Sequence, residues 1–160
     1  MAHTPEHRLH DLLDGFDTAM LFTGRTQRHA SPMEIAELTE TGEIFFVTSD
    51  TSAKVDEIKS DANVTLAFQN GRTFVSLNGT AEILHDADLI EDLWSEAWRV
   101  WFPEGKDDPT LCIIKVVPST AEYWDTSGGN VISYAFEAAK AYIKGRTPEV
   151  SNDQHGKINL

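Results

Sequence analysis

The residues best suited to chemistry lie between positions 45 and 58, in the stretch FFVTSDTSAKVDEI. A short apolar run, typical of a β-strand, ends at Val47, and a loop of hydroxyl-bearing residues follows it. This loop leads into a predicted helix that carries Lys54 in its first turn. Free amides at a helix start, the positive end of the helix dipole, hydroxyl groups and one ammonium group together suit a phosphate. The stretch therefore predicts a site for a phosphorylated ligand.

The same loop also has a purely structural interpretation. Serine and threonine are common helix N-caps, because their side-chain oxygens accept hydrogen bonds from backbone amides of the first turn. Thr51 or Ser52 could serve only that purpose, with Lys54 exposed to solvent. The local sequence alone leaves both interpretations open.

Composition narrows the class of protein. The chain has 160 residues and a formal net charge of −13, which disfavours a general affinity for nucleic acid or for anionic membranes. This length can bury a full core, and we expect a single domain over residues 1–160. No stretch resembles a signal peptide or a membrane span, so we expect a cytoplasmic protein.

Other kinds of reactive site find little support. None of the six histidines lies at a familiar metal-ligand spacing from cysteine or carboxylate residues, so we expect no metal site. Cys112 stands alone in the apolar run LCIIKVV, where we interpret it as a small buried residue and not as a nucleophile. No side-chain acid or base stands out, and the sequence assigns no catalytic residue.

The remaining chain is mainly β-strands with flanking helices. Strands are predicted at residues 18–23, 31–38, 44–48, 64–68, 73–84 and 111–124, and helices at 6–16, 52–60, 88–102 and 131–143. Six strands with short connections favour a small antiparallel barrel. Gly79, inside the longest strand, predicts a β-bulge.

Three tryptophans, Trp94, Trp98 and Trp101, are spaced four and three residues apart within the predicted helix at 88–102. That spacing places them on one helix face. Packing in a core or a dimer interface is the favoured interpretation, and stacking on a planar ligand is the alternative.

These pieces, in this order, resemble the general stress protein branch of the pyridoxamine 5′-phosphate oxidase-like superfamily of FMN-binding split barrels. The resemblance runs from about residue 19 to residue 160. It is most distinctive in LWSEAWRVWFPEGKDDPTLCIIKVVPSTAEYWD at residues 93–125, and AAKAYIKGRTPEVSNDQHGKINL at the chain end also matches. It implies a six-stranded antiparallel split β-barrel and a homodimer with two FMN sites at the subunit interface, each formed by both chains.

The resemblance also implies which residues hold FMN. The loop and helix start would contact the phosphate, two further strands would lie against the ring, and an aromatic segment would lie at the interface or the pocket rim. The phosphate contacts would come from Thr48, Ser49, Ser52 and Lys54. One strand along the ring would carry Met33 and Glu34, and the other would carry Phe74, Val75 and Ser76. The interface or rim would include Trp124 and the WFP segment at 101–103.

One position departs from the pattern of this branch. The second strand usually reads Arg-Pro-Met, whereas this chain has Ser-Pro-Met at residues 31–33. Losing a charge-assisted contact between that arginine and the phosphate would weaken binding by about 1–3 kcal/mol. Arg25, Arg28 and Arg72 are the candidates to replace it.

Two functions follow from the resemblance. The first is a flavin-dependent oxidoreductase that takes electrons from NAD(P)H or an organic substrate. It would differ from a true pyridoxamine phosphate oxidase, because the sequence shows no basic site for a substrate phosphate. The second is a non-catalytic flavin carrier with a role in stress response. A split barrel that binds another ligand, such as haem or a deazaflavin, is a weaker alternative.

Overall fold

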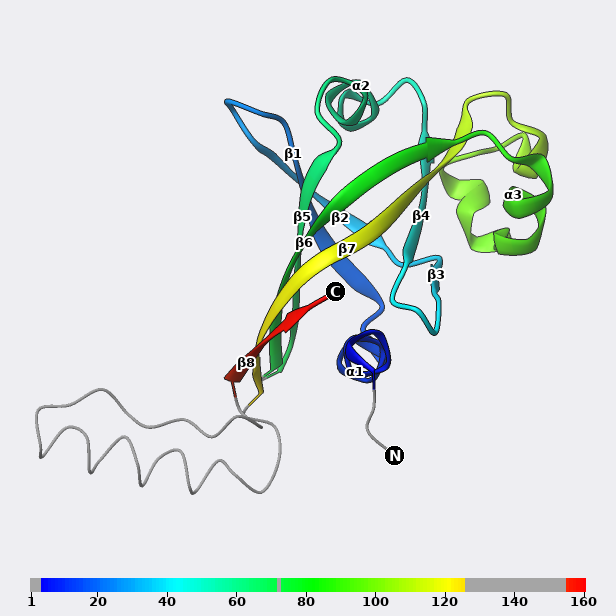
Figure 1. Ribbon diagram of the computed structural model, residues 1–160. Helices are drawn as coiled ribbons and strands as arrows, with labels where there is room; N and C mark the ends of the chain where they lie inside the picture. Colours follow the sequence, from blue (N-terminus) through cyan, green and yellow to red (C-terminus); the bar gives the residue numbers. More distant parts are fainter. Residues whose placement is uncertain (1–3, 72, 126–154) are drawn as a thin grey trace, which may run out of the picture.

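The computed structural model describes residues 4–71, 73–125 and 155–160, and within them an antiparallel sheet curls into a split barrel (Figure 1). The strand order is β2-β1-β5-β6-β7-β4-β3, and β8 pairs with β7. The predicted fold class is confirmed, although the described residues form eight strands instead of six. The strands are β1 Thr18–Thr23, β2 His29–Glu34, β3 Glu37–Leu38, β4 Ile44–Ser49, β5 Asn63–Asn70, β6 Thr73–Leu84, β7 Leu111–Asp125 and β8 His155–Asn159.

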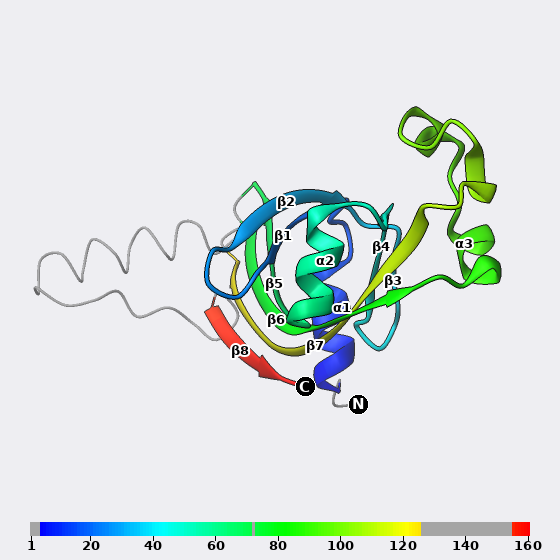
Figure 2. The same ribbon diagram turned by 90° about the horizontal axis from the view of Figure 1, so that it is seen from above.

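Two helices lie over opposite ends of the curled sheet (Figure 1; Figure 2). Helix α1 (Pro5–Leu13) begins at Thr4, whose Oγ1 accepts a hydrogen bond from the amide of His7 at 3.3 Å, and it ends earlier than the predicted residue 16. Helix α2 (Ala53–Ser60) buries Val55 and Ile58. The helix predicted at 131–143 lies outside the described residues. No helix in the described part of the chain is long and apolar enough to cross a membrane.

The main core fills the barrel with alternate residues of the strands. Strand β6 shows the pattern, because Val75, Leu77 and Ala81 are buried while Asn78 and Thr80 are exposed. Side chains alternate between the two faces of a strand, so one face of β6 packs inward and the other meets solvent.

Strands β2 and β3 follow one another in the chain but pair with different strands of the sheet. The amide of Ile35 donates to the carbonyl of Asp17 at 2.8 Å, and the next amide, of Ala36, donates to the carbonyl of Phe45 at 2.8 Å. Strand β2 pairs with β1, whereas β3 pairs with β4. The prediction of one strand over 31–38 is therefore wrong, because the segment joins opposite ends of the sheet.

The β-bulge predicted at Gly79 is confirmed by a register shift between Asn78 and Gly79 in the pairing of β6 with β7. A Cβ at Gly79 would lie 2.4 Å from the carbonyl oxygen of Val117, so no side chain fits there. Strand β7 continues through Pro118, opposite this bulge.

The prediction of one continuous helix over residues 88–102 is wrong. Helix α3 (Ala87–Leu93) ends before Trp94, and a separate 3₁₀ helix, η1 (Glu96–Val100), follows; a second one, η2, spans Gly105–Asp107. The ring of Trp94 packs edge-on against Trp98, with centroids 5.8 Å apart, and its indole N–H donates to Glu96 at 3.0 Å. This packing outweighs helix propensity at the break.

A second apolar cluster, separate from the main core, stabilises this α3–η1 region. Its buried members come from η1 and its neighbourhood and from the adjoining strands; they are Phe45, Ile90, Trp98, Phe102, Leu111 and Ile113. The cluster fixes η1 beside the end of β4.

Candidate functional site

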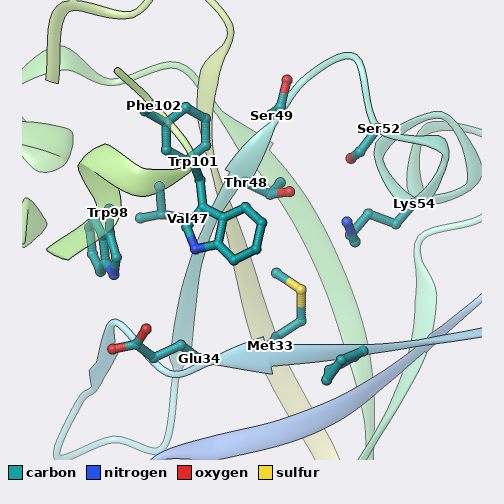
Figure 3. Close-up of a pocket in the computed structure, with 11 residues that line it drawn as sticks. Met33, Glu34, Val47, Thr48, Ser49, Ser52, Lys54, Trp98, Trp101 and Phe102 are labelled. Atoms are coloured by element: carbon teal, nitrogen blue, oxygen red, sulfur yellow. The ribbon is translucent and has the colours of Figure 1, made fainter. Parts of the chain in front are cut away.

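A cleft of about 580 Å³ lies where β2 and β4 approach without pairing (Figure 3). This volume is within the range of small-molecule sites. The walls come from β2, from β4, from the start of α2, and from η1 with the two residues after it. Strand β2 contributes Pro32, Met33 and Glu34, and β4 contributes Val47, Thr48 and Ser49. The start of α2 contributes Ser52 and Lys54, and η1 with the two residues after it contributes Trp98, Trp101 and Phe102.

The hydroxyl-rich loop forms the first part of the polar end of the cleft, which we define as Thr48, Ser49, Ser52 and Lys54. The amide of Ser52 donates to the carbonyl of Ser49 at 3.1 Å, and the hydroxyls of Ser49 and Thr51 lie 2.8 Å apart. These contacts form a tight turn that points the start of α2 at the cleft. Local hydrogen bonding of hydroxyl residues explains why the chain turns here.

Ser52 is the N-cap residue of α2, yet its side chain makes no capping hydrogen bond. Its Oγ is buried and has no hydrogen-bond partner among the described residues. A buried hydroxyl without a partner costs about 1–3 kcal/mol, so this arrangement is unfavourable unless something else binds the oxygen. The capping interpretation of Ser52 is therefore not supported, and the hydroxyl is available to a ligand.

Lys54 supplies the positive charge of the polar end, and Figure 3 shows its side chain beside Ser52. It forms no ion pair or hydrogen bond with any other described residue. The amides of Ala53 and Lys54, in the first turn of α2, also lack an acceptor within the described ranges. Two amides, one hydroxyl and one ammonium thus gather where the helix dipole is positive, which suits an anionic group.

Glu57 ties α2 to β1 and to β2. Its carboxylate accepts a hydrogen bond from Thr23, the last residue of β1, and pairs with His29, the first residue of β2. The hydrogen bond from Thr23, followed by that from His29, holds the pKa of Glu57 below its ordinary value. These contacts fix the helix that presents Ser52 and Lys54.

The other end of the cleft, which we call the aromatic end, consists of Met33, Val47, Trp98, Trp101 and Phe102. Met33 belongs to the main core, and Trp98 and Phe102 belong to the second cluster. The ring of Trp101 instead reaches into the cleft toward Met33 (Figure 3). A planar apolar group therefore has packed side chains on several sides.

Strand β4 adds backbone groups to this apolar surface. Beyond Phe45, no described strand pairs with the edge of β4 that faces β3. The carbonyl of Phe45 uses that edge to accept from Ala36, and alternation along the strand puts the amide and carbonyl of Val47 on the same edge. The cleft thus offers one backbone donor and one acceptor beside apolar walls, an arrangement that suits a nitrogen heterocycle.

The family described as pyridoxamine 5′-phosphate oxidase like matches residues 4–149. The chain belongs to this family. One of two curated relatives that match this chain, a general stress protein, supports the general stress protein branch. General stress protein 26 of Bacillus subtilis is 34% identical over 80 residues, 47% of this chain and 56% of that protein. Protein bli-3 of Neurospora crassa is 30% identical over 125 residues, 71% of this chain and 59% of that protein. The chain thus spans less than two thirds of either relative.

Solved structures of general stress proteins share the fold. A candidate general stress protein 26 from Jannaschia sp. CCS1 has a TM-score of 0.71 and 23% identity, with 98% of both chains covered. The general stress FMN/FAD binding protein of Xanthomonas citri has a TM-score of 0.67 and 25% identity, with 78% of this chain and 90% of that chain covered. These likenesses confirm the split barrel.

The sequence-predicted site residues of this pyridoxamine 5′-phosphate oxidase-like chain fall into two groups. Six of them line the cleft: Met33, Glu34, Thr48, Ser49, Ser52 and Lys54. Trp101 and Phe102 of the WFP segment line it too, and their role at an interface or pocket rim stays a prediction. Sequence reasoning did not single out Pro32 and Val47, although each is adjacent to a predicted residue, and it favoured packing for Trp98.

The other four predicted residues lie elsewhere on the sheet of this family member. Phe74 and Trp124 are cross-strand partners on its outer face, where Trp124 stacks on His155 with ring centroids 5.2 Å apart. Ser76 lines a separate outer groove, and Val75 is buried in the main core. The cleft of one chain does not bring them together with the first group, so their role in binding stays a prediction.

No described arginine lines the cleft of this pyridoxamine 5′-phosphate oxidase-like protein. Arg28 donates to the hydroxyl of Thr65 at 3.0 Å, Arg25 is not among the lining residues, and Arg72 lies outside the described residues. Neither Arg25 nor Arg28 therefore takes the place of the arginine that the branch usually has at position 31. Lys54 is therefore the single cationic side chain among the described lining residues.

Cys112 is the cross-strand partner of Thr48, on strand β7 beside the β4 wall of the cleft. It is fully buried, and burial, with a smaller contribution from Asp50, raises the pKa of its thiol to about 11. The thiol stays protonated at neutral pH, which confirms the interpretation of a small buried residue over that of a nucleophile.

Proposed function

We propose that this chain binds FMN in the cleft, with the phosphate at the polar end and the ring at the aromatic end. The observation that carries the proposal is the buried, unpartnered hydroxyl of Ser52 beside Lys54 and two free amides. A phosphate oxygen would accept hydrogen bonds from all of these groups. The description of the Xanthomonas citri relative as an FMN/FAD binding protein supports the same ligand.

We infer that the function is that of a flavin-dependent oxidoreductase, with NAD(P)H or a small organic molecule as the redox partner. Bound FMN supplies the electron or hydride transfer, while the protein binds and orients. Glu34 and Lys54 are the only titratable side chains among the described lining residues, which fits a protein that leaves the chemistry to its cofactor. With Lys54 assigned to FMN, these residues hold no second cation for a substrate phosphate, so pyridoxamine phosphate oxidation is not proposed.

We also propose a homodimer in which the partner chain adds residues to each FMN site. The outer face of the sheet supports this arrangement, because Met20, Phe74 and Trp124 are exposed there. Apolar groups of this size on one face suit an interface between subunits. Sedimentation equilibrium should give twice the mass of the chain. A monomeric mass at micromolar concentrations would contradict the dimer and leave FMN binding to be judged separately.

The test of FMN binding is an absorbance spectrum of the purified protein after FMN is added and the excess is removed. Flavin bands should stay with the protein. Lys54→Ala should weaken FMN binding at least tenfold, as expected for losing a charged contact to phosphate, without lowering the melting temperature. Lys59→Ala, on the same helix but outside the cleft, is the matched control and should leave affinity unchanged. Equal affinities of the two variants would remove Lys54 from the site.

A non-catalytic flavin carrier is the second candidate, because the same scarcity of titratable side chains among the described lining residues also fits a protein without turnover. Steady NAD(P)H oxidation that rises in proportion to bound FMN would support the oxidoreductase. Tightly bound FMN with no NAD(P)H oxidation above that of free FMN would support the carrier.

A further inference from the structure

Trp101 differs from the other two tryptophans of its region. Trp94 and Trp98 pack in or against the second apolar cluster, and Trp98 is only 8% exposed. Trp101 belongs to neither core and is 77% exposed, yet it lines the cleft. An exposed side chain of this size gains little from packing, so its placement at a cleft calls for another explanation.

The position of Trp101 is fixed by its neighbours. The amides of Trp101 and Phe102 both donate to the carbonyl of Trp98 at 2.9 Å, and the amide of Gly105 donates to the carbonyl of Phe102 at 2.9 Å. Trp98 and Phe102, on either side of it, are buried in the second cluster. The backbone that carries Trp101 is therefore held by packed residues, while the indole stays free to contact a ligand.

The surroundings of the indole also suit a planar ring. Figure 3 shows it reaching into the cleft toward Met33, with Val47 close to its base. The cleft thus has an apolar wall on the β2 side and an exposed aromatic ring on the η1 side. Indole binds flat rings well because it offers a large apolar face and has only two side-chain torsions to restrict.

We propose that Trp101 binds the ring of the flavin by stacking on it, independently of the phosphate contacts of Lys54. The inference rests on the proposed FMN binding and deepens it, because it divides recognition between two ends of one cleft. Aromatic stacking on a heterocyclic ring contributes enough that its loss should weaken binding about tenfold.

Riboflavin, which has the ring without the phosphate, separates the two contributions. Trp101→Ala should weaken FMN and riboflavin by the same factor of about ten, and Trp101→Phe should weaken both by about threefold. Lys54→Ala should weaken FMN alone. Val100→Ala is the matched control, because Val100 is 78% exposed in the same segment but does not line the cleft. Dissociation constants come from quenching of flavin fluorescence, with melting temperatures measured for every variant.

A second readout reports contact directly. An indole stacked on a flavin quenches its emission, so riboflavin bound to Trp101→Ala should have a longer fluorescence lifetime than riboflavin bound to the wild type. Wild-type binding with no change in Trp101→Ala, in affinity or lifetime, would overturn the proposal for Trp101 and leave FMN binding intact. Dissociation of a dimer by Trp101→Ala at unchanged riboflavin affinity would overturn it too, by making Trp101 an interface residue. Failure of the wild type to bind either flavin would overturn both proposals.

Discussion

The two ends of the cleft are built in opposite ways. The polar end comes from one short stretch, Thr48 to Lys54. Among the described residues it contains a buried hydroxyl without a hydrogen-bond partner and an ammonium group without an ion pair or hydrogen bond. The aromatic end is assembled from β2, β4 and η1, and most of its side chains are packed in one of the two apolar clusters. Stability therefore depends on the aromatic end, whereas the polar end keeps its groups for a ligand at some loss of stability.

The largest effect is expected from Phe102→Ala, which removes a buried ring from the second cluster. Replacing a buried phenylalanine by alanine lowers the free energy of unfolding by about 3–5 kcal/mol, through lost burial and the cavity left behind. Urea unfolding followed by circular dichroism measures the loss. A loss below about 1 kcal/mol would contradict the view that the aromatic end stabilises the fold.

Ser52→Ala should weaken FMN binding without lowering the stability of the fold. Removing an N-cap serine usually lowers the free energy of unfolding by about 1 kcal/mol, but Ser52 makes no capping bond. Removing its unpartnered hydroxyl should leave stability unchanged or raise it by up to about 1 kcal/mol, while FMN binding weakens about fivefold. Urea unfolding without FMN and a fluorescence titration measure the two quantities.

Thr4→Ala is the matched control for this comparison, because the Oγ1 of Thr4 does accept a capping hydrogen bond at the start of α1. It should lower the free energy of unfolding by about 1 kcal/mol and leave FMN affinity unchanged. If Ser52→Ala destabilises the protein as much as Thr4→Ala does, Ser52 is an ordinary cap and its hydroxyl is not reserved for a ligand.

The same contrast explains what the sequence could predict. Thr48, Ser49, Ser52 and Lys54 are neighbours in the chain, so residue types and spacing were sufficient to group them. The spacing of Trp98 and Trp101 predicts that they share one helix face, but the chain leaves the helix at Trp94 because side-chain packing decides its course there. Local spacing carries no information about that packing.

The pairing of strands far apart in the sequence could not be predicted either. The alternating pattern of residues 31–38 fits one strand, and nothing in it marks the exchange of partners at Ile35 and Ala36. The backbone groups of Val47 became part of the site only because β3 stops pairing at Phe45. The fold class and the bulge at Gly79 could be predicted, since strand patterns and glycine preferences are local.

A smaller effect concerns the anchor of the polar end. Because the pKa of Glu57 is lowered in the folded protein, its contacts add stability above the ordinary pKa of about 4.5 and lose it as the pH falls through the folded value. Glu57→Gln should therefore reduce the fall in stability between neutral and acidic pH. Asp56→Asn, an exposed neighbour on the same helix, is the control. Parallel pH profiles of urea midpoints for wild type and Glu57→Gln would show that Glu57 does not hold α2 by its charge.

The smallest effect is expected where the chain departs from the pattern of its branch. Ser31 lies two residues before Met33 on β2, so both side chains point to the same face of the strand, yet Ser31 does not line the cleft. A long arginine side chain at this position reaches further than serine and adds a second cation to a site that has only Lys54. Ser31→Arg should tighten FMN binding about threefold, less than a direct charged contact provides, and leave riboflavin binding unchanged.

Ser31→Lys separates the effect of the added charge from that of the planar donor geometry of arginine. Equal tightening of FMN and riboflavin by Ser31→Arg would show that the new side chain acts on the ring, and the division of the cleft into a phosphate end and a ring end would then be wrong.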